Sequence, residues 1–264
     1  MTALNRRVAT SVGELALADQ GSGTPILMWP SVFSDHRLFD LVRADLGEDW
    51  RVIRIDGPGF GQSDAPATNV QPAQYAEAVV EVFDALGIAR AVVAGCSWGG
   101  QVVAHLGVQA PERVIGVLMM NTPMAPSTGN HRAQVVGTRL LGSTRFWGRG
   151  VARAMFAPPF RTAHPEQVAA FVASFTTFDP VAATTTVRTT MTRFPGLQDV
   201  LPHLQTRTII MMGECDTQYP VHAAMPIAAR APQAHIEIVP GCGHLAPLEA
   251  PEAVADALRS LAQH

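Results

Sequence analysis

The chain has 264 residues, 47% of them hydrophobic and 16% charged, which favours a globular protein and argues against a disordered one. A net charge of −3, with no long run of basic residues, argues against a nucleic-acid partner. No apolar run reaches the roughly 18 to 20 residues that span a bilayer, and the first residues lack the apolar stretch of a secretory signal. We therefore expect a cytoplasmic protein with neither nucleic-acid nor membrane partners, as a monomer or a homodimer.

Short strand-like runs alternate with helical patterns through the first half of the chain, as in a mostly parallel sheet covered by helices. Residues 12–19 alternate apolar and polar side chains, which predicts a half-exposed strand near a sheet edge. Nearly continuous apolar runs predict buried strands at 25–29, 51–56, 91–95 and about 114–120. Helical spacing of apolar residues predicts helices at 71–87 and from 100 to near Pro111.

The pattern changes between residues 124 and 198, where no buried-strand run occurs and prolines interrupt loosely helical spacing. The earlier alternation then resumes, with strands at 208–213 and 235–241 and helices at about 220–230 and 251–263. We therefore predict an α/β core, residues 1–123 and 199–264, that is divided by a helical cap at 124–198.

The predicted cap is basic. It carries eight arginines against only Glu166 and Asp179, a net charge of +6, whereas the rest of the chain has −9. Most of these arginines are expected on solvated helix surfaces. One or two that faced a pocket would favour an anionic substrate.

One short motif indicates the chemistry. Gly95-Cys96-Ser97-Trp98-Gly99 matches G-x-S-x-G and stands directly after a predicted buried strand and directly before a helix. In such a tight turn the serine takes a strained backbone conformation, and glycines permit close approach on both sides. Ser97 should therefore project above the sheet edge as a nucleophile. The N-terminus of the helix beside it would stabilise a developing oxyanion.

A serine nucleophile needs a histidine base and a carboxylate that orients the histidine. Asp216 follows the strand predicted at 208–213, and His244 lies in the loop after the last predicted strand. The order Ser97, Asp216, His244 is the nucleophile, acid, base order of the α/β-hydrolase arrangement. Glu214 is a rival acid, but strand alternation would point it away from the site that Asp216 faces.

These motifs resemble those of the α/β-hydrolase superfamily over nearly the whole chain. Besides the serine turn, three loops resemble family motifs: DGPGFGQSD at 56–64, GECDTQYP at 213–220 and GCGHLAPLEAPEAV at 241–254. The resemblance implies an α/β-hydrolase fold, with a mostly parallel eight-stranded sheet, flanking helices and a helical cap inserted after the sixth strand. It also implies structural roles for Asp56 and Glu249.

The chain departs from the family pattern after its third strand, where Trp29-Pro30 replaces His-Gly. The resemblance implies an oxyanion hole made of the backbone N–H groups of Ser31 and Trp98; Pro30 has no N–H but is not required to donate one. The Ser31 hydroxyl could add a donor or only cap the loop. We also expect Trp29 and Trp98 to line the substrate pocket, with the Trp98 indole as a wall that limits acyl size.

Cys96, Cys215 and Cys242 all fall in the motif loops but lack C-x-x-C spacing. A thiolate-metal site with Asp216 or His244 would consume the acid or the base. Small buried thiols are therefore the preferred interpretation, with redox sensitivity as an alternative. We expect no cofactor and no metal.

The identity of the nucleophile and the charge of the cap limit the reactions that we expect of this chain. A serine at position 97 excludes the carboxylate attack of the similar epoxide hydrolases and haloalkane dehalogenases, and a basic cap disfavours proline iminopeptidases. The chain is most similar to the 3-oxoadipate enol-lactone hydrolase and esterase group. That similarity implies hydrolysis of a small-molecule ester or lactone through an acyl-enzyme on Ser97, with a small carboxylate-bearing substrate as one option. Two alternatives stay open: a carbon–carbon bond hydrolase of the same fold, and a small-ligand sensor that turns over slowly.

Overall fold

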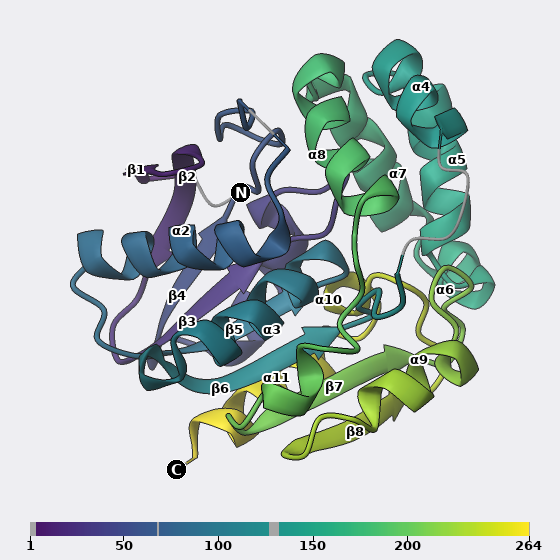
Figure 1. Ribbon diagram of the computed structural model, residues 1–264. Coiled ribbons are helices and arrows are strands. Elements are labelled where there is room, and N and C mark those ends of the chain that lie inside the picture. Colours follow the sequence, from purple (N-terminus) through teal and green to yellow (C-terminus); the bar gives the residue numbers. More distant parts are fainter. Residues whose placement is uncertain (1–3, 68, 127–131, 264) are drawn as a thin grey trace.

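The computed structural model describes residues 4–67, 69–126 and 132–263, and these are built around one eight-stranded sheet (Figure 1). The strand order is β1-β2-β4-β3-β5-β6-β7-β8, and all neighbours from β4 to β8 run parallel. The strands are β1 (Arg6–Thr10), β2 (Gly13–Gln20), β3 (Thr24–Trp29), β4 (Trp50–Ile55), β5 (Ala91–Cys96), β6 (Val114–Met120), β7 (Thr208–Gly213) and β8 (Ala234–Val239). The predicted eight-stranded, mostly parallel α/β fold is confirmed.

The first edge of the sheet differs from the prediction for residues 12–19. β2 is not a half-exposed strand, because all four residues from Leu15 to Ala18 are fully buried. It is paired with β1 along one edge and with β4 along the other, and both pairings are antiparallel. The edge strand is β1, which the sequence pattern did not reveal because Val8 is its single buried residue.

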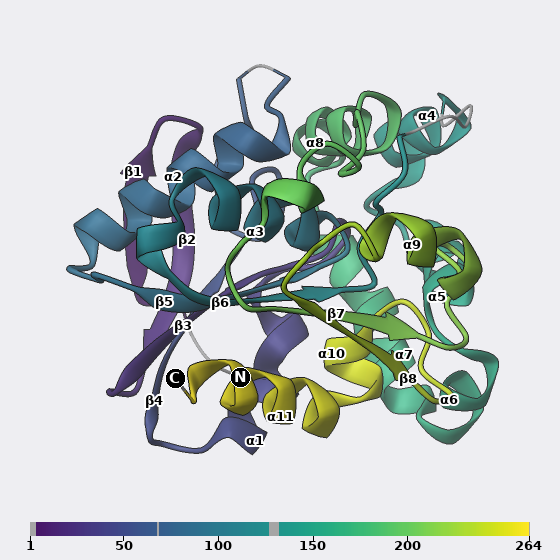
Figure 2. The same cartoon turned by 60° about the horizontal axis from the view of Figure 1, so that its bottom comes forward.

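Helices cover both faces of the sheet (Figure 2). α2 packs beside α3 on one face, and α1 packs beside α11 on the other. Among the described residues, no helix combines the length and the apolar character that crossing a bilayer requires. The core helices are α1 (Asp40–Leu46), α2 (Pro72–Ala85), α3 (Trp98–Gln109), α9 (Val221–Ala228), α10 (Ala246–Glu249) and α11 (Pro251–Ala262). Short 3-10 helices span His36–Phe39, Pro111–Arg113, Phe175–Thr177 and Leu201–His203.

The segment between β6 and β7 contributes helices, and no strand occurs among its described residues. These helices gather beyond one end of the sheet (Figure 1 and Figure 2). They are α4 (Arg132–Leu141), α5 (Arg145–Met155), α6 (Pro158–Ala163), α7 (Pro165–Ser174) and α8 (Pro180–Thr192). Residues 127–131 of the predicted cap lie outside the described residues.

Aromatic rings join this cap to the core. Phe175 stacks on Phe33 of the loop after β3, with ring centroids 5.8 Å apart. Phe178 meets Phe60 of the loop after β4 edge to face, at 5.5 Å. Such pairs add about 0.5–1.5 kcal/mol each beyond the area they bury. The cap is therefore anchored on two of the loops that end the parallel strands.

The N-terminal turn of α3 packs directly against the end of β3. A Cβ atom added at Gly99 would lie 2.2 Å from the Trp29 carbonyl oxygen and 2.9 Å from that of Pro30. Both are backbone atoms that cannot turn aside, so only glycine permits this approach. The contact holds the loop after β3 beside the start of α3.

We predict that Gly99→Ala lowers the free energy of unfolding by about 3 kcal/mol, the upper end of the usual cost of overpacking. Gly150→Ala is the matched control, because a Cβ at Gly150 in α5 meets nothing within 4 Å. That control should gain about 0.5–1 kcal/mol from helix propensity. Urea unfolding measures both variants, and equal midpoints would contradict the prediction.

Candidate active site

Ser97 occupies the tight turn between β5 and α3. Its φ of 55° and ψ of −115° form a backbone conformation that non-glycine residues rarely adopt, and the residue is 3% exposed. A Cβ at Gly95 would lie 2.0 Å from the Gly99 carbonyl oxygen, so the turn closes only with glycine there. The Ser97 N–H donates to the Met120 carbonyl at 2.8 Å, which ties the turn to β6. The local geometry is the strained strand-to-helix turn that the G-x-S-x-G motif predicts.

His244 and Asp216 form a buried hydrogen-bonded pair. His244 Nδ1 lies 2.8 Å from Asp216 Oδ2, and each side chain is 1% exposed. Asp216 Oδ1 accepts hydrogen bonds from the backbone N–H groups of Gln218 at 2.8 Å and Tyr219 at 3.1 Å. Burial by itself raises the pKa of a carboxyl group. The charge and hydrogen bond of His244, together with the Tyr219 N–H, outweigh burial and lower the pKa of Asp216 below its usual value.

The rival carboxylate, Glu214, lies away from this pair. Its side chain accepts a hydrogen bond from the Gly241 N–H at 2.9 Å, and the residue is exposed. Glu214 therefore braces the turn after β8. Of the two acids considered from the sequence, Asp216 is the one that contacts His244.

Asn121 is a further partner of Asp216 that the sequence analysis missed. Its Nδ2 donates to Asp216 Oδ2 at 3.1 Å and to the Gly243 carbonyl at 2.9 Å. Asn121 is 2% exposed and has a positive φ of 49°. Because it directly follows β6, its amide bridges the loop after β7 and the loop after β8. The available signal was its position, a polar residue at the carboxyl end of a buried strand.

The cap is hydrogen-bonded to the loop that carries His244. The His244 N–H donates to the Met155 carbonyl of α5 at 2.7 Å. The Oε2 atom of Glu249 accepts from the N–H groups of Ala157 and Gly243, at 3.0 Å each. Glu249 thus joins the cap chain to the histidine loop, the structural role that the resemblance implies. Burial raises the pKa of this carboxyl group.

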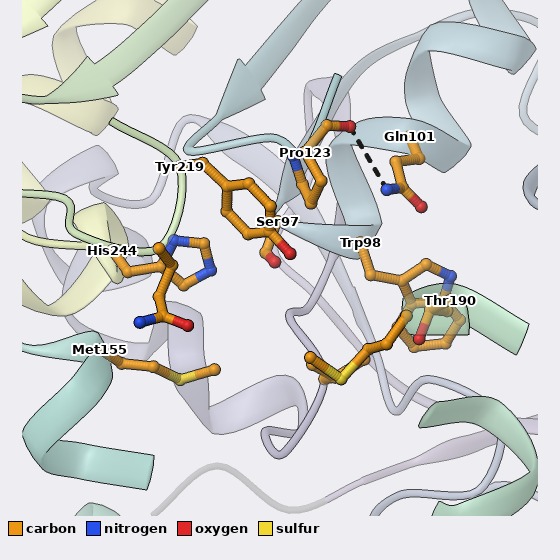
Figure 3. Close-up of a pocket in the computed structure, with 11 residues that line it drawn as sticks. Ser97, Trp98, Gln101, Pro123, Met155, Thr190, Tyr219 and His244 are labelled. Carbon is orange, nitrogen blue, oxygen red and sulfur yellow. Dashed lines mark hydrogen bonds between the residues drawn. The ribbon is translucent and has the colours of Figure 1, made fainter. Parts of the chain in front are cut away.

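Ser97 and His244 line the same narrow cavity between core and cap (Figure 3). Its volume is about 30 Å³, room for only a few water molecules. In Figure 3 Ser97 lies between His244 on one side and Trp98 on the other. Tyr219, which the sequence analysis also missed, lies beside them, with its ring centroid 5.4 Å from that of His244. The position of Tyr219 in the GECDTQYP turn, three residues after Asp216, was the sequence feature that indicated this placement.

The two tryptophans predicted to line the pocket occupy different positions. Trp98 lines the cavity, and its indole packs against Trp29 and Tyr75 with ring centroids 5.5 and 5.2 Å away. Trp29 is fully buried and is not among the residues around the cavity. It supports the pocket wall from behind instead of lining the pocket as predicted, because β3 turns its side chain into the core.

The loop after β3 holds the other predicted oxyanion donor, Ser31. Ser31 is fully buried, and its carbonyl accepts a hydrogen bond from Ser34 Oγ at 2.7 Å. Its neighbour Val32 lines the cavity. The close contact at Gly99 brings this loop to the first turn of α3, next to the Trp98 N–H. Ser31 and Trp98 as oxyanion donors stay a prediction.

No arginine lines the Ser97 cavity in the described parts of the chain. Three cap arginines, Arg149, Arg153 and Arg161, instead surround a separate surface hollow of about 300 Å³. The lining near Ser97 is neutral and includes Val32, Gln101, Pro123, Met155, Thr190 and Met191. The electrostatic reason to expect a carboxylate-bearing substrate is therefore missing at Ser97.

Two of the three cysteines pack beneath the site. Cys96 and Cys242 are buried, and burial raises the pKa of both thiols. Cys215 is half-buried, and all three are free thiols. Cys96 and Cys242 are thus the small buried packing groups predicted from the sequence.

Among the described residues, Asp35, His36 and Asp56 place potential metal-ligating atoms within 4.8 Å of one another. Asp56 already accepts hydrogen bonds from the His36 N–H at 2.9 Å and from the Gln62 N–H at 2.8 Å. Asp35 caps the following 3-10 helix and pairs with Arg37. These partners give the cluster a loop-shaping role, as the resemblance implies for Asp56.

We predict that two substitutions of Asn121 differ in their pH dependence. Asn121→Asp adds a second carboxylate beside Asp216, so one of the two carboxyl groups acquires a raised pKa. A raised folded-state pKa means that the stability contribution is present at low pH and is lost as pH rises. Asn121→Asp should therefore be about 1–3 kcal/mol more destabilised at pH 8 than at pH 5.

Asn121→Ala is the matched control. It should cost about 1.5–3 kcal/mol, the usual value of a hydrogen bond to a charged group. The lowered pKa of Asp216 keeps that carboxylate ionised across this pH range, so the cost should stay constant. Urea unfolding at the two pH values measures both variants. An equal destabilisation of Asn121→Asp at pH 5 and pH 8 would contradict the prediction.

The sequence model of the alpha/beta hydrolase family matches residues 21–257. A 2-hydroxy-6-oxononadienedioate/2-hydroxy-6-oxononatrienedioate hydrolase from a Pseudomonas species is 27% identical over 254 residues, which cover 89% of this chain and 83% of the relative. A carboxylesterase from Bacillus subtilis is 26% identical over 259 residues, which cover 94% of this chain and 83% of the relative.

The fold is shared with a solved enol-lactonase from Burkholderia xenovorans. The TM-score is 0.88 at 20% sequence identity, over 98% of this chain and 100% of the other. This likeness extends the agreement from short motifs to the complete fold, and with the family match it confirms the resemblance. The chain belongs to the alpha/beta hydrolase family.

Proposed function

We propose that this protein is a serine hydrolase that cleaves carboxylic esters or lactones through an acyl-enzyme on Ser97. The observation that carries the proposal is the buried His244–Asp216 pair, 2.8 Å apart, beside the cavity that Ser97 lines. Asp216 engages Nδ1 of His244, so Nε2 is the nitrogen that can take the serine proton. The carboxylesterase relative and the shared fold of the enol-lactonase support hydrolysis of these two substrate classes.

The reaction would proceed in two steps, acylation of Ser97 and hydrolysis of the acyl-enzyme. Ser97 Oγ bonds to the substrate carbonyl carbon while its proton passes to His244; the bond to the leaving oxygen then breaks, and His244 protonates that oxygen. Water next attacks the acyl-enzyme and gives a proton to His244, which returns it to Ser97 as the carboxylic acid leaves. Asp216 stays ionised and stabilises the imidazolium in both halves. With a lactone, the alcohol and the acid remain in one molecule.

The oxyanion formed in each half would be bound by the N–H groups of Ser31 and Trp98. Trp98 begins α3, and the first N–H groups of a helix have no partner within the helix. The helix dipole also favours negative charge at this end. The backbone contact at Gly99 supports the pairing, because it holds the Ser31 loop beside that helix terminus. Each donor would contribute about 3–4 kcal/mol to the transition state.

The neutral cavity lining favours an uncharged substrate. A buried carboxylate without a cationic partner is costly, and no arginine of the described residues reaches this cavity. We therefore place a neutral ester or lactone ahead of the carboxylate-bearing substrate that the basic cap suggested. A carbon–carbon bond hydrolase is the second candidate, favoured by the Pseudomonas relative.

We expect the purified protein to release nitrophenolate from 4-nitrophenyl acetate, and Ser97→Ala to reduce this rate to background. Asp216→Asn should lower kcat by about 10⁴, because His244 loses its orientation and tautomer. Absorbance assays measure both effects. Intact-protein mass spectrometry of wild type should also show an added acetyl group, which Ser97→Ala should lack.

Ser11→Ala is the matched control, since Ser11 is exposed in the turn between β1 and β2. It should keep the wild-type rate. Full turnover by Ser97→Ala would rule out the serine mechanism. A folded wild type that binds small esters or lactones but hydrolyses none of them would favour the sensor alternative.

A further inference from the structure

A second cavity adjoins the Ser97 cavity. It has a volume of about 190 Å³ and lies under α4, α5 and α8 of the cap. Its lining includes Phe33, Trp147, Val151 and Ala154 and carries no charged side chain among the described residues. Three residues line both cavities, namely Met155, Met191 and Gln218. The two spaces therefore adjoin at these three residues, which are called the partition below.

The volumes of the two cavities decide where a substrate can fit. The Ser97 cavity holds only a few water molecules, so it can accept the carbonyl group but not a chain of several methylenes. The second cavity is about six times larger and mostly apolar. An acyl chain attached at Ser97 must therefore pass the partition to be buried.

Two of the three partition residues are suited to move aside. Methionine is unbranched and has three rotatable side-chain bonds, so it adapts to new packing at low cost. Figure 3 shows the Met155 side chain at the edge of the Ser97 cavity, across from Pro123. The Met155 carbonyl is held by the His244 N–H at 2.7 Å, so its side chain can rotate while its backbone stays fixed. Met191 comes from a different helix, α8, and is half-buried.

We propose that Met155 and Met191 form a movable partition, and that the cavity behind it binds the acyl chain of an ester. The inference rests on the proposed function of Ser97. It names the substrate class as esters with an unbranched, uncharged acyl chain of several carbons. Branching next to the carbonyl is disfavoured because the space at Ser97 is narrow. The neutral second cavity excludes a charged chain end.

The first experiment compares kcat/KM for three nitrophenyl esters. Burial of each added methylene should raise kcat/KM about fourfold until the second cavity is filled. 4-Nitrophenyl hexanoate should therefore exceed the acetate at least about tenfold. The trimethylacetate ester, which is branched next to the carbonyl, should be slower than the acetate after correction for its intrinsic reactivity. A hexanoate rate equal to or below that of the acetate would overturn the proposal.

Two substitutions test the partition in opposite directions. Val151→Phe fills the second cavity from α5 and should lower the hexanoate-to-acetate ratio at least about tenfold, because the chain loses its burial site. Met191→Ala removes part of the partition. It should raise the ratio about two- to tenfold, because the acyl chain no longer has to hold the Met191 side chain off its preferred rotamer. Met225→Leu on α9, outside both cavities, is the control that should leave the ratio unchanged.

Circular dichroism and urea unfolding establish that each variant is folded, and the ratio of the two substrates cancels any loss of active enzyme. Ratios for Val151→Phe and Met191→Ala within twofold of wild type would overturn the partition. Ser97→Ala separates this result from failure of the proposed function. If that variant loses both activities while the ratios do not move, the acyl site is wrong and the serine mechanism stands.

Discussion

The site depends on one steric constraint, the backbone contact between the start of α3 and the strands beside it. At Gly95 and Gly99 an added Cβ would fall about 2 Å from carbonyl oxygens, so neither position accepts a side chain without moving the chain. The same contact forces Ser97 into its positive-φ conformation. Ser97, the Trp98 N–H and the loop after β3 are therefore positioned together, and disturbing any one of them disturbs the others. Strain is stored where the chemistry is proposed to occur.

Asp216 and His244 are fixed by a second network that reaches into the cap. Asn121, after β6, holds both Asp216 and the loop of His244, and the His244 N–H is bonded to the Met155 carbonyl. Lifting the cap away at this point would break a hydrogen bond of the histidine loop and displace the proposed base. Side-chain motion within a stationary cap enlarges the cavity without that cost. The hydrogen bond from the His244 N–H to the Met155 carbonyl therefore favours the proposed movable partition over a hinged lid.

The sequence predicted the parts of the site that local patterns encode. Ser97, Asp216 and His244 each follow a parallel strand, β5, β7 and β8 in turn, and parallel strands bring their carboxyl ends to one edge of the sheet. Asn121 follows such a strand too, but asparagine at a loop start is common and no local pattern distinguishes it. The error at Trp29 has a different cause, since the pattern locates the end of β3 but not which way its last side chain turns. The cavity-lining methionines depend on how α5 and α8 pack, which loose helical periodicity does not determine.

The cap shows why net charge is a poor guide to specificity. Its surplus of arginines suggested an anionic substrate, yet Arg149, Arg153 and Arg161 surround a hollow that shares no lining residue with the Ser97 cavity. Charges in contact with water are screened over about 10 Å at moderate salt, so they act weakly on a buried carbonyl group. Side chains that line a cavity act without that screening, and among the described residues no acidic residue or arginine lines the Ser97 cavity. The proposed substrate preference therefore rests on the shape and polarity of a few lining residues, whatever charge the cap surface carries.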